Sequence, residues 1–160
     1  MSPEFSRIDI SSRFEICVGF RRLSFLSSFG SLDGFSQEMG QDSDLYRKRL
    51  THHIAQVPDG NLHLWVGGAI VGQCEAKTVA DEAVGYISLL CLTPEARGQG
   101  YGRLMHERLV QVFGERGKRR LNLSVSWSNQ LALGFYRRLG WRDLGPRPDK
   151  PSVALMEFLL

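Results

Sequence analysis

Apolar residues recur at helical spacing in the first third of the chain. Residues 14–29 carry apolar side chains three and four positions apart, which predicts a helix, and residues 42–57 repeat this pattern. Asp42 or Ser43 would cap the second helix. Its inward-facing residues are expected to be Leu45, Leu50, Ile54 and Val57. A short alternating stretch over residues 5–11 predicts a strand ahead of both helices.

Beyond residue 60 the pattern changes to alternation and short apolar runs, which are typical of strands. Two strands are expected around a turn at Gly67–Gly68. The elements that follow are strands at 84–93, 119–127 and 152–160 and helices at 101–114 and 129–140. A β-rich start with a later β-α-β-α-β order predicts an α/β fold, a mixed sheet with helices on both faces. The whole chain, residues 1–160, is expected to form a single domain.

Composition restricts the class of protein without naming a function. The 160 residues are 42% hydrophobic and 23% charged, with a formal net charge of +3, as in an ordinary globular domain. An odd number of cysteines (three) in dissimilar contexts predicts a cytoplasmic protein without a metal site. No secretory leader and no membrane span are expected, because the first residues include charges and no apolar stretch approaches ~20 residues.

Three glycines at alternate positions follow the apolar run at 84–93. They are Gly98, Gly100 and Gly102, where that strand ends and a helix begins. The dinucleotide pattern GxGxxG fails at Arg103, and the phosphate-binding P-loop pattern fails because its lysine is missing. With Arg97 beside them, the glycines would let several main-chain N–H groups converge at a helix start, which predicts an anion site of pyrophosphate size. A merely flexible turn is the alternative.

Two segments of the sequence resemble one known family. Arg97, Gly100 and Gly102 match the pattern (Q/R)-x-x-G-x-(G/A) of the GNAT superfamily of acyl-CoA-dependent N-acyltransferases. Its second signature is similar to "NQLALGFYRRLGW", in which the matching residues are Asn129, Ala132, Tyr136, Gly140 and Trp141. Specific residues match only between about 84 and 141, although the element order agrees over nearly the whole chain.

The resemblance implies that acetyl-CoA is the co-substrate and lies in a cleft of the sheet. A central, mostly antiparallel sheet would splay apart between strands 84–93 and 119–127. A bulge near Leu90, Cys91 and Leu92 would aim a free N–H at the thioester carbonyl and stabilise its oxyanion. The residues expected to bind the coenzyme are Leu90, Cys91, Leu92, Arg97, Gly98, Gln99, Gly100, Tyr101, Gly102, Arg103, Asn129 and Tyr136.

The resemblance also implies a reaction in which an amine attacks the thioester directly. Tyr136 matches the position that serves the departing thiolate. A thiol titrates near ~8.5 and tyrosine near ~10, so donation of a hydrogen bond is favoured over full proton transfer. Packing within its helix is the other role open to Tyr136. Asn129 would hold pantetheine or simply cap its helix.

The general base is less clearly indicated. Some members of the family that the chain resembles have a glutamate on the strand that enters the cleft, but residues 84–92 contain no carboxylate. Glu75 on the preceding strand is therefore the candidate, with Tyr86 or Ser88 holding a water. A solvent-facing position for Glu75 is the alternative. His52 or His53 could face an acceptor. Cys91 could accept the acyl group itself, but it would need a lowered pKa, and a buried small hydrophobe is the simpler interpretation.

The function predicted is an N-acetyltransferase acting on a primary amine of a small molecule or a protein. A catalytically silent CoA-binding regulatory module is the alternative. The basic run 116–120 lacks interleaved aromatic residues, so no nucleic-acid partner is expected. The resemblance implies that acceptor choice depends on residues 14–57, whose carboxylates would attract a cationic amine: Asp33, Glu38, Asp42 and Asp44. An ordinary helix-loop-helix surface of the same composition is the alternative. The protein is expected to be a monomer or a homodimer.

Overall fold

The computed structural model describes residues 2–160 as seven strands and five α-helices joined by short turns. The strands are β1 (Glu4–Arg7), β2 (Leu62–Val66), β3 (Ala69–Thr78), β4 (Val84–Leu92), β5 (Arg120–Ser126), β6 (Arg142–Arg147) and β7 (Lys150–Leu159). The helices are α1 (Ile10–Phe29), α2 (Phe35–Met39), α3 (Asp44–Gln56), α4 (Tyr101–Glu115) and α5 (Gln130–Arg138). Single 3-10 turns span Gln41–Ser43, Pro58–Gly60 and Pro94–Ala96.

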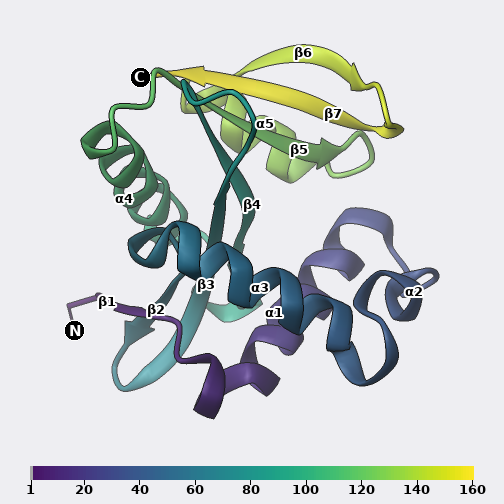
Figure 1. The fold of residues 1–160 in the computed structure, drawn as a ribbon, viewed down its shortest axis with the longest axis vertical. Coiled ribbons are helices and arrows are strands. Elements are labelled where there is room, and N and C mark those ends of the chain that lie inside the picture. The colour runs from purple at the N-terminus through teal and green to yellow at the C-terminus, as the bar shows by residue number, and fades with distance from the viewer. Residues whose placement is uncertain (1) are drawn as a thin grey trace.

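All seven strands form one sheet in the order β1-β2-β3-β4-β5-β7-β6. Every neighbouring pair is antiparallel except β4 and β5, which run parallel because α4 connects them as a crossover. The turn at Gly67–Gly68 joins β2 to β3, with both glycines in the left-handed conformation. In Figure 1 the strands β5, β6 and β7 lie together with α5 at the top of the molecule, away from β1 and β2.

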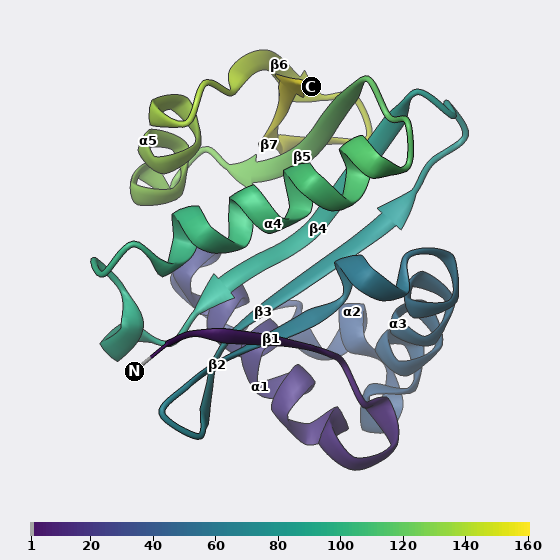
Figure 2. The same ribbon diagram turned by 90° about the vertical axis from the view of Figure 1, so that its left-hand side faces the viewer.

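Helices cover both faces of the sheet. Figure 2 shows α4 in front of β4, with α1 behind the strands. The main core joins the sheet to α4 and α5 through fully buried residues such as Leu109, Phe113 and Leu133. On the other face, Phe14 and Cys17 of α1 pack with Tyr46 and Leu50 of α3. The mixed, mostly antiparallel sheet with helices on both faces is therefore confirmed.

The elements differ from the predicted ones mainly in the first third and at the end. Helix α1 begins at Ile10, earlier than expected, because Asp9 caps it by accepting from the Ser11 amide at 3.2 Å. Ser43 precedes α3 but makes no side-chain capping bond. Leu45 was expected to face inward and is 44% exposed, so that prediction is wrong.

Helix α2 and strand β6 were not predicted. Strand β6 contains Gly145 and Pro146, and irregularities in its pairing with β7 surround both residues. Such a strand lacks the alternating pattern that identifies strands in a sequence. Among residues 2–160 no helix combines the length and apolar character that a bilayer crossing requires.

Candidate active site

The glycine segment forms a left-handed loop that leads into α4. Gly98 and Gly100 have φ angles of +75° and +86°, which residues with a Cβ rarely adopt. Gly100 is the N-cap of α4 and supplies no side chain, so the first amides of the helix have no side-chain acceptor at that cap. These donors and the helix dipole suit an anionic ligand.

Gly102 serves a different purpose from the two loop glycines. It lies in the first turn of α4, and a Cβ there would come within 3.2 Å of the Phe135 ring on α5. The missing side chain lets α4 and α5 approach each other beside the loop. The segment thus meets two demands, left-handed backbone at Gly98 and Gly100 and close packing at Gly102.

Strands β4 and β5 pair only at their beginnings. Their ladder ends at the pair Tyr86 and Asn122, after which the strands diverge towards the left of Figure 2. The gap opens into a groove of about 590 Å³ next to the glycine loop. Its lining includes ten of the twelve residues predicted to bind the coenzyme: Leu90, Cys91, Leu92, Arg97, Gly98, Gly100, Gly102, Arg103, Asn129 and Tyr136. Contact of these residues with a coenzyme stays a prediction.

The other two predicted residues lie elsewhere. Gln99 and Tyr101 line a separate depression beside β3. The Gln99 side chain donates to the Glu95 carbonyl at 2.9 Å, which turns it back on its own loop. Neither residue belongs to the lining of the groove, and their contact with the coenzyme stays a prediction.

The strand bulge lies earlier than predicted. The register of β3 against β4 shifts between Glu75, which faces Leu89, and Ala76, which faces Ile87. Ser88 is therefore the extra residue, two positions before Leu90, and the expected place is wrong. Its Oγ is buried without a hydrogen-bond partner among residues 2–160. Residues 84–92 are nearly all apolar, so their sequence has no alternating pattern from which the shift in register could be predicted.

Tyr136 lies where the groove narrows. Its side chain lines both the 590 Å³ groove and a smaller pocket of about 90 Å³ between β4 and β5. Burial raises the pKa of its hydroxyl, and the thiols of Cys74 and Cys91 raise it further. Tyr136 therefore stays protonated and can donate a hydrogen bond. Asn129 caps α5 by accepting from the Ala132 amide at 3.2 Å, and it also faces the groove.

The small pocket contains polar residues that the sequence reasoning mostly missed. Four serines contribute to its lining, with Asn129 and Tyr136: Ser24, Ser28, Ser88 and Ser124. No carboxylate or imidazole among the described residues lines it. The alternation of residues 119–127 places Ser124 on the face opposite the buried Leu123 and Val125, so the pattern indicates its face but not its place in a pocket. Ser24 and Ser28 come from α1 and carry no such signal.

Comparison with known proteins identifies the family. The profile of the Acetyltransferase (GNAT) family matches residues 27–141. This chain belongs to the GNAT family. The resemblance stated from the glycine segment and from residues 129–141 is confirmed.

Two bacterial relatives of this GNAT chain are similar over part of its length. A [Ribosomal protein bS18]-alanine N-acetyltransferase from Haemophilus influenzae is 32% identical over 95 residues, which cover 58% of this chain and 63% of the relative. A Bacillus subtilis protein ascribed the same activity is 31% identical over 106 residues, covering 66% and 64%. The chain thus spans less than two thirds of the length of each relative.

Solved structures show the same fold. A PaiA N-acetyltransferase from Thermoplasma acidophilum, in complex with coenzyme A, superposes with a TM-score of 0.82 at 18% identity over 100% of both chains. Arabidopsis thaliana Naa50, in complex with the bisubstrate analogue CoA-Ac-MVNAL, gives 0.71 at 15% identity over 100% of both chains.

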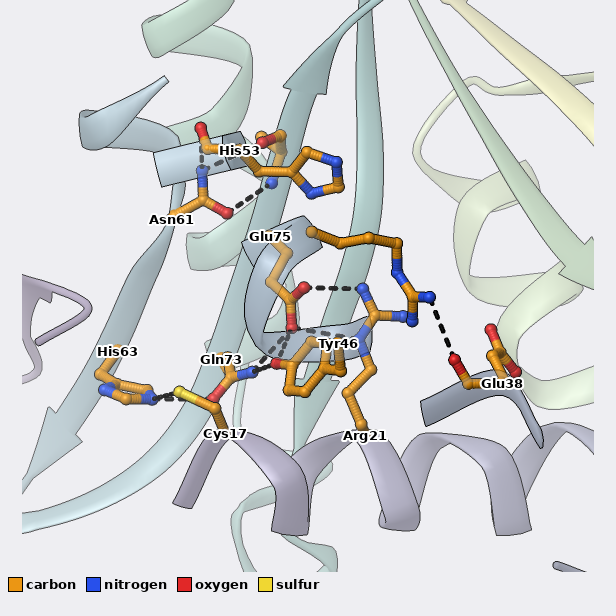
Figure 3. Close-up of polar contacts among 11 residues, drawn as sticks. Cys17, Arg21, Glu38, Tyr46, His53, Asn61, His63, Gln73 and Glu75 are labelled. Carbon is orange, nitrogen blue, oxygen red and sulfur yellow. Dashed lines mark hydrogen bonds and ion pairs between the residues drawn. The ribbon is translucent and has the colours of Figure 1, made fainter. Parts of the chain in front are cut away.

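Glu75, the predicted base, lies in a buried polar network on the other face of the GNAT sheet (Figure 3). Arg21 Nη2 donates to its Oε1 at 2.7 Å, and Tyr46 and Gln73 donate to Oε2 at 2.7 and 2.8 Å. Gln73 Oε1 in turn lies 2.8 Å from His63 Nε2. The solvent-facing alternative for Glu75 is wrong, because its side chain is only 1% exposed.

The contacts of Glu75 favour a positioning role over a catalytic one. Burial opposes ionisation, but the Arg21 charge and the hydrogen bonds outweigh it, so the pKa of Glu75 is lowered. A saturated carboxylate of low pKa is a weak proton acceptor. Glu75 is also absent from the lining of the groove and of the small pocket. Its predicted role as a base stays untested.

The structure also gives the surroundings of the other residues considered from the sequence, beginning with Cys91. Burial raises the pKa of Cys91 to about 11, in spite of Arg97 nearby, so its thiol is a weak nucleophile.

The basic run 116–120 is paired within the protein. Arg116 pairs with Asp59, Arg120 pairs with Asp81, and Lys118 donates to the Glu82 carbonyl. His52 is exposed, whereas His53 is partly buried. Among the described residues no group of His, Cys, Asp and Glu could hold a metal ion.

Proposed function

We propose that this GNAT protein transfers the acetyl group of acetyl-CoA to the α-amino group of a protein N-terminus by direct attack. One observation carries the proposal: the groove opened by the separation of β4 and β5 joins the glycine loop at one end to Tyr136 at the other. A ligand with an anionic diphosphate and a long arm fits such a site, because amide donors lie at one end and an unpaired strand edge runs along it.

The coenzyme would be bound mainly by main-chain groups. The amides at the start of α4 would hold the diphosphate, with Arg97 and Arg103 adding positive charge at the groove. Beyond Tyr86 the edge of β4 that faces β5 has no strand partner, so its N–H and C=O groups are available to the amides of the pantetheine arm. The thioester would then lie near Tyr136.

An α-amine suits the polar but uncharged small pocket. Its usual pKa of about 7.7 to 8.0 leaves a substantial neutral fraction at neutral pH, whereas a lysine amine titrates near ~10.4. Only the neutral amine attacks the thioester carbon, and its proton then passes to water held by the serine hydroxyls of the pocket. The relatives named as alanine N-acetyltransferases and the peptide-like analogue bound to Naa50 support this acceptor.

Tyr136 would assist departure of the sulfur. As the carbon–sulfur bond breaks, negative charge grows on the sulfur, and the Tyr136 hydroxyl donates a hydrogen bond to it. The raised pKa of Tyr136 makes full proton transfer less favourable and keeps the donor in place. In Tyr136→Phe we expect kcat to fall by about 100-fold, with little change in coenzyme A affinity.

The decisive experiment measures free coenzyme A released from acetyl-CoA with a panel of peptides and small amines. Cys91→Ala should keep its activity if the amine attacks directly, and should lose it if the acyl group passes through the thiol. Release with peptides but not with blocked N-termini supports the proposal. Calorimetric binding of coenzyme A without release by any amine would instead support the catalytically silent module.

A further inference from the structure

A half-buried lysine lies beside the opening of the sheet. Lys77 on β3 places its Nζ 4.9 Å from the centre of the Tyr86 ring on β4. Within residues 2–160 this ammonium has no carboxylate partner and makes no hydrogen bond. The ammonium is not among the buried unpartnered atoms, so it is an accessible positive charge with which a carboxylate of a ligand could pair.

The same Tyr86 connects Lys77 to the small pocket. Its hydroxyl lies 2.6 Å from Ser124 Oγ on β5, and Ser124 lines that pocket together with Tyr136. Arg147, at the end of β6, donates from Nη1 to the same Ser124 Oγ at 3.3 Å. Lys77 and Arg147 are thus connected to the pocket through Tyr86 and Ser124, although neither of them belongs to its lining.

Positive charge is in excess around Lys77. Burial lowers its pKa, and the guanidinium groups of Arg147, Arg21 and Arg49 lower it further. Two carboxylates partly balance these cations: Glu75 pairs with Arg21, and the exposed Asp149 pairs with Arg147. Among residues 2–160, Arg49 donates to the Glu38 carbonyl and to no carboxylate. His53 on α3 faces the same region and is neutral, because burial and Lys77 lower its pKa to about 4.

We propose that Lys77, assisted by Arg147, binds a carboxylate near the N-terminus of the acceptor, so that acidic peptides are the preferred substrates. This inference rests on the proposed function and names its substrate class. A polyamine would bring a second positive charge against Lys77 and is disfavoured. The carboxylates predicted to attract cationic amines do not line the pocket: Asp33, Glu38, Asp42 and Asp44 are all exposed.

The test compares otherwise identical peptides that carry Glu, Gln or Lys at their first, second or third position. At one of these positions the Glu peptide should exceed the Gln peptide in kcat/KM by about tenfold, mainly through KM, because the Lys77 ammonium, which has no carboxylate partner among the described residues, gains a charge-assisted hydrogen bond. Lys77→Gln should bring the two peptides within about twofold of each other. Lys77→Glu should reverse the preference towards the Lys peptide.

Lys48→Glu is the matched control, since Lys48 is exposed on α3 and takes no part in the pocket. It should leave the preference unchanged. Equal rates for Glu and Gln peptides at all three positions, or a preference that survives Lys77→Gln, would overturn the inference while leaving the proposed function intact. No release with any peptide would overturn the proposed function itself, and the acidic acceptor with it.

Discussion

The two faces of the sheet carry polar groups in opposite ways. On the side of β4, α4 and α5 the site offers main-chain amides and a few side chains that lie close together in the sequence. On the side of α1 and α3, polar side chains from four elements satisfy one another in a buried network. The first arrangement leaves donors free for a ligand, whereas the second uses nearly all of them internally.

This difference separates binding from positioning. A carboxylate with four hydrogen bonds from Arg21, Tyr46 and Gln73 fixes α1 and α3 against β3. Helix α1 also contributes Ser24 and Ser28 to the small pocket. The network can therefore shape the acceptor side without contacting the reacting atoms. Mutations in the buried network should therefore lower stability, whereas mutations in the glycine loop should weaken coenzyme A binding.

The largest expected effect follows Glu75→Gln. The change leaves Arg21 without its counter-charge, and we expect the free energy of unfolding to drop by about 3 kcal/mol. This free-energy loss is small for a broken buried ion pair, because the Arg21 side chain is 21% exposed and can regain some contact with water. Urea unfolding at neutral pH measures the loss.

Asp143→Asn is the control for Glu75→Gln. It breaks the Arg137–Asp143 pair, whose side chains are 46% and 32% exposed, and should cost less than about 1 kcal/mol. Coenzyme A affinity should be unchanged in both variants. If Glu75→Gln keeps wild-type stability but loses turnover, Glu75 acts on the reaction and the positioning role is wrong.

The glycine loop could be predicted because its requirement is local. Left-handed backbone at Gly98 and Gly100 and close packing at Gly102 each restrict the residue type at one position. The same holds for Asn129, which caps α5 within its own segment. Such features are readable without knowledge of what lies across the sheet.

The network and the bulge could not be predicted for the opposite reason. Glu75 is buried because Arg21 reaches it from 54 positions away, and no local pattern pairs the two. The bulge at Ser88 lies in a run that is nearly all apolar, so the sequence shows no alternation whose break would mark its place. Strand β6 pairs irregularly around Gly145 and is held by β7 rather than by its own propensity.

Acid should weaken the buried network before it affects the glycine loop. Burial lowers the pKa of His63, and its Nδ1 has no partner among the described residues. In the unfolded chain the imidazole binds a proton near ~6.5, but in the folded protein it binds one only at lower pH. Stability is therefore complete above that pH and falls as the pH drops towards the lowered pKa, by up to about 2 kcal/mol for each such histidine between pH 7 and 5.

Urea unfolding at several pH values tests this histidine effect. His63→Gln should reduce the slope of stability against pH between 6.5 and 5, whereas His52→Gln, an exposed histidine, should not. His106 adds a similar slope from the other face, since burial lowers its pKa and its Nε2 accepts from Trp141 Nε1 at 2.8 Å. The lowered pKa of Glu75 contributes only below ~4.5. A slope unaffected by His63→Gln would contradict the assignment.

Alanine at two matched glycines should change stability only slightly and should separate coenzyme binding from stability most clearly. Gly100 and Gly117 lie at opposite ends of α4, both with positive φ and with open space where a Cβ would be added. Each Gly→Ala change should therefore cost about 1 kcal/mol in backbone strain alone. Only Gly100→Ala should also weaken coenzyme A binding, by about tenfold in calorimetry, because the amides at the start of α4 move with their cap. Equal affinities in the two variants would mean that the diphosphate is not held at this helix end.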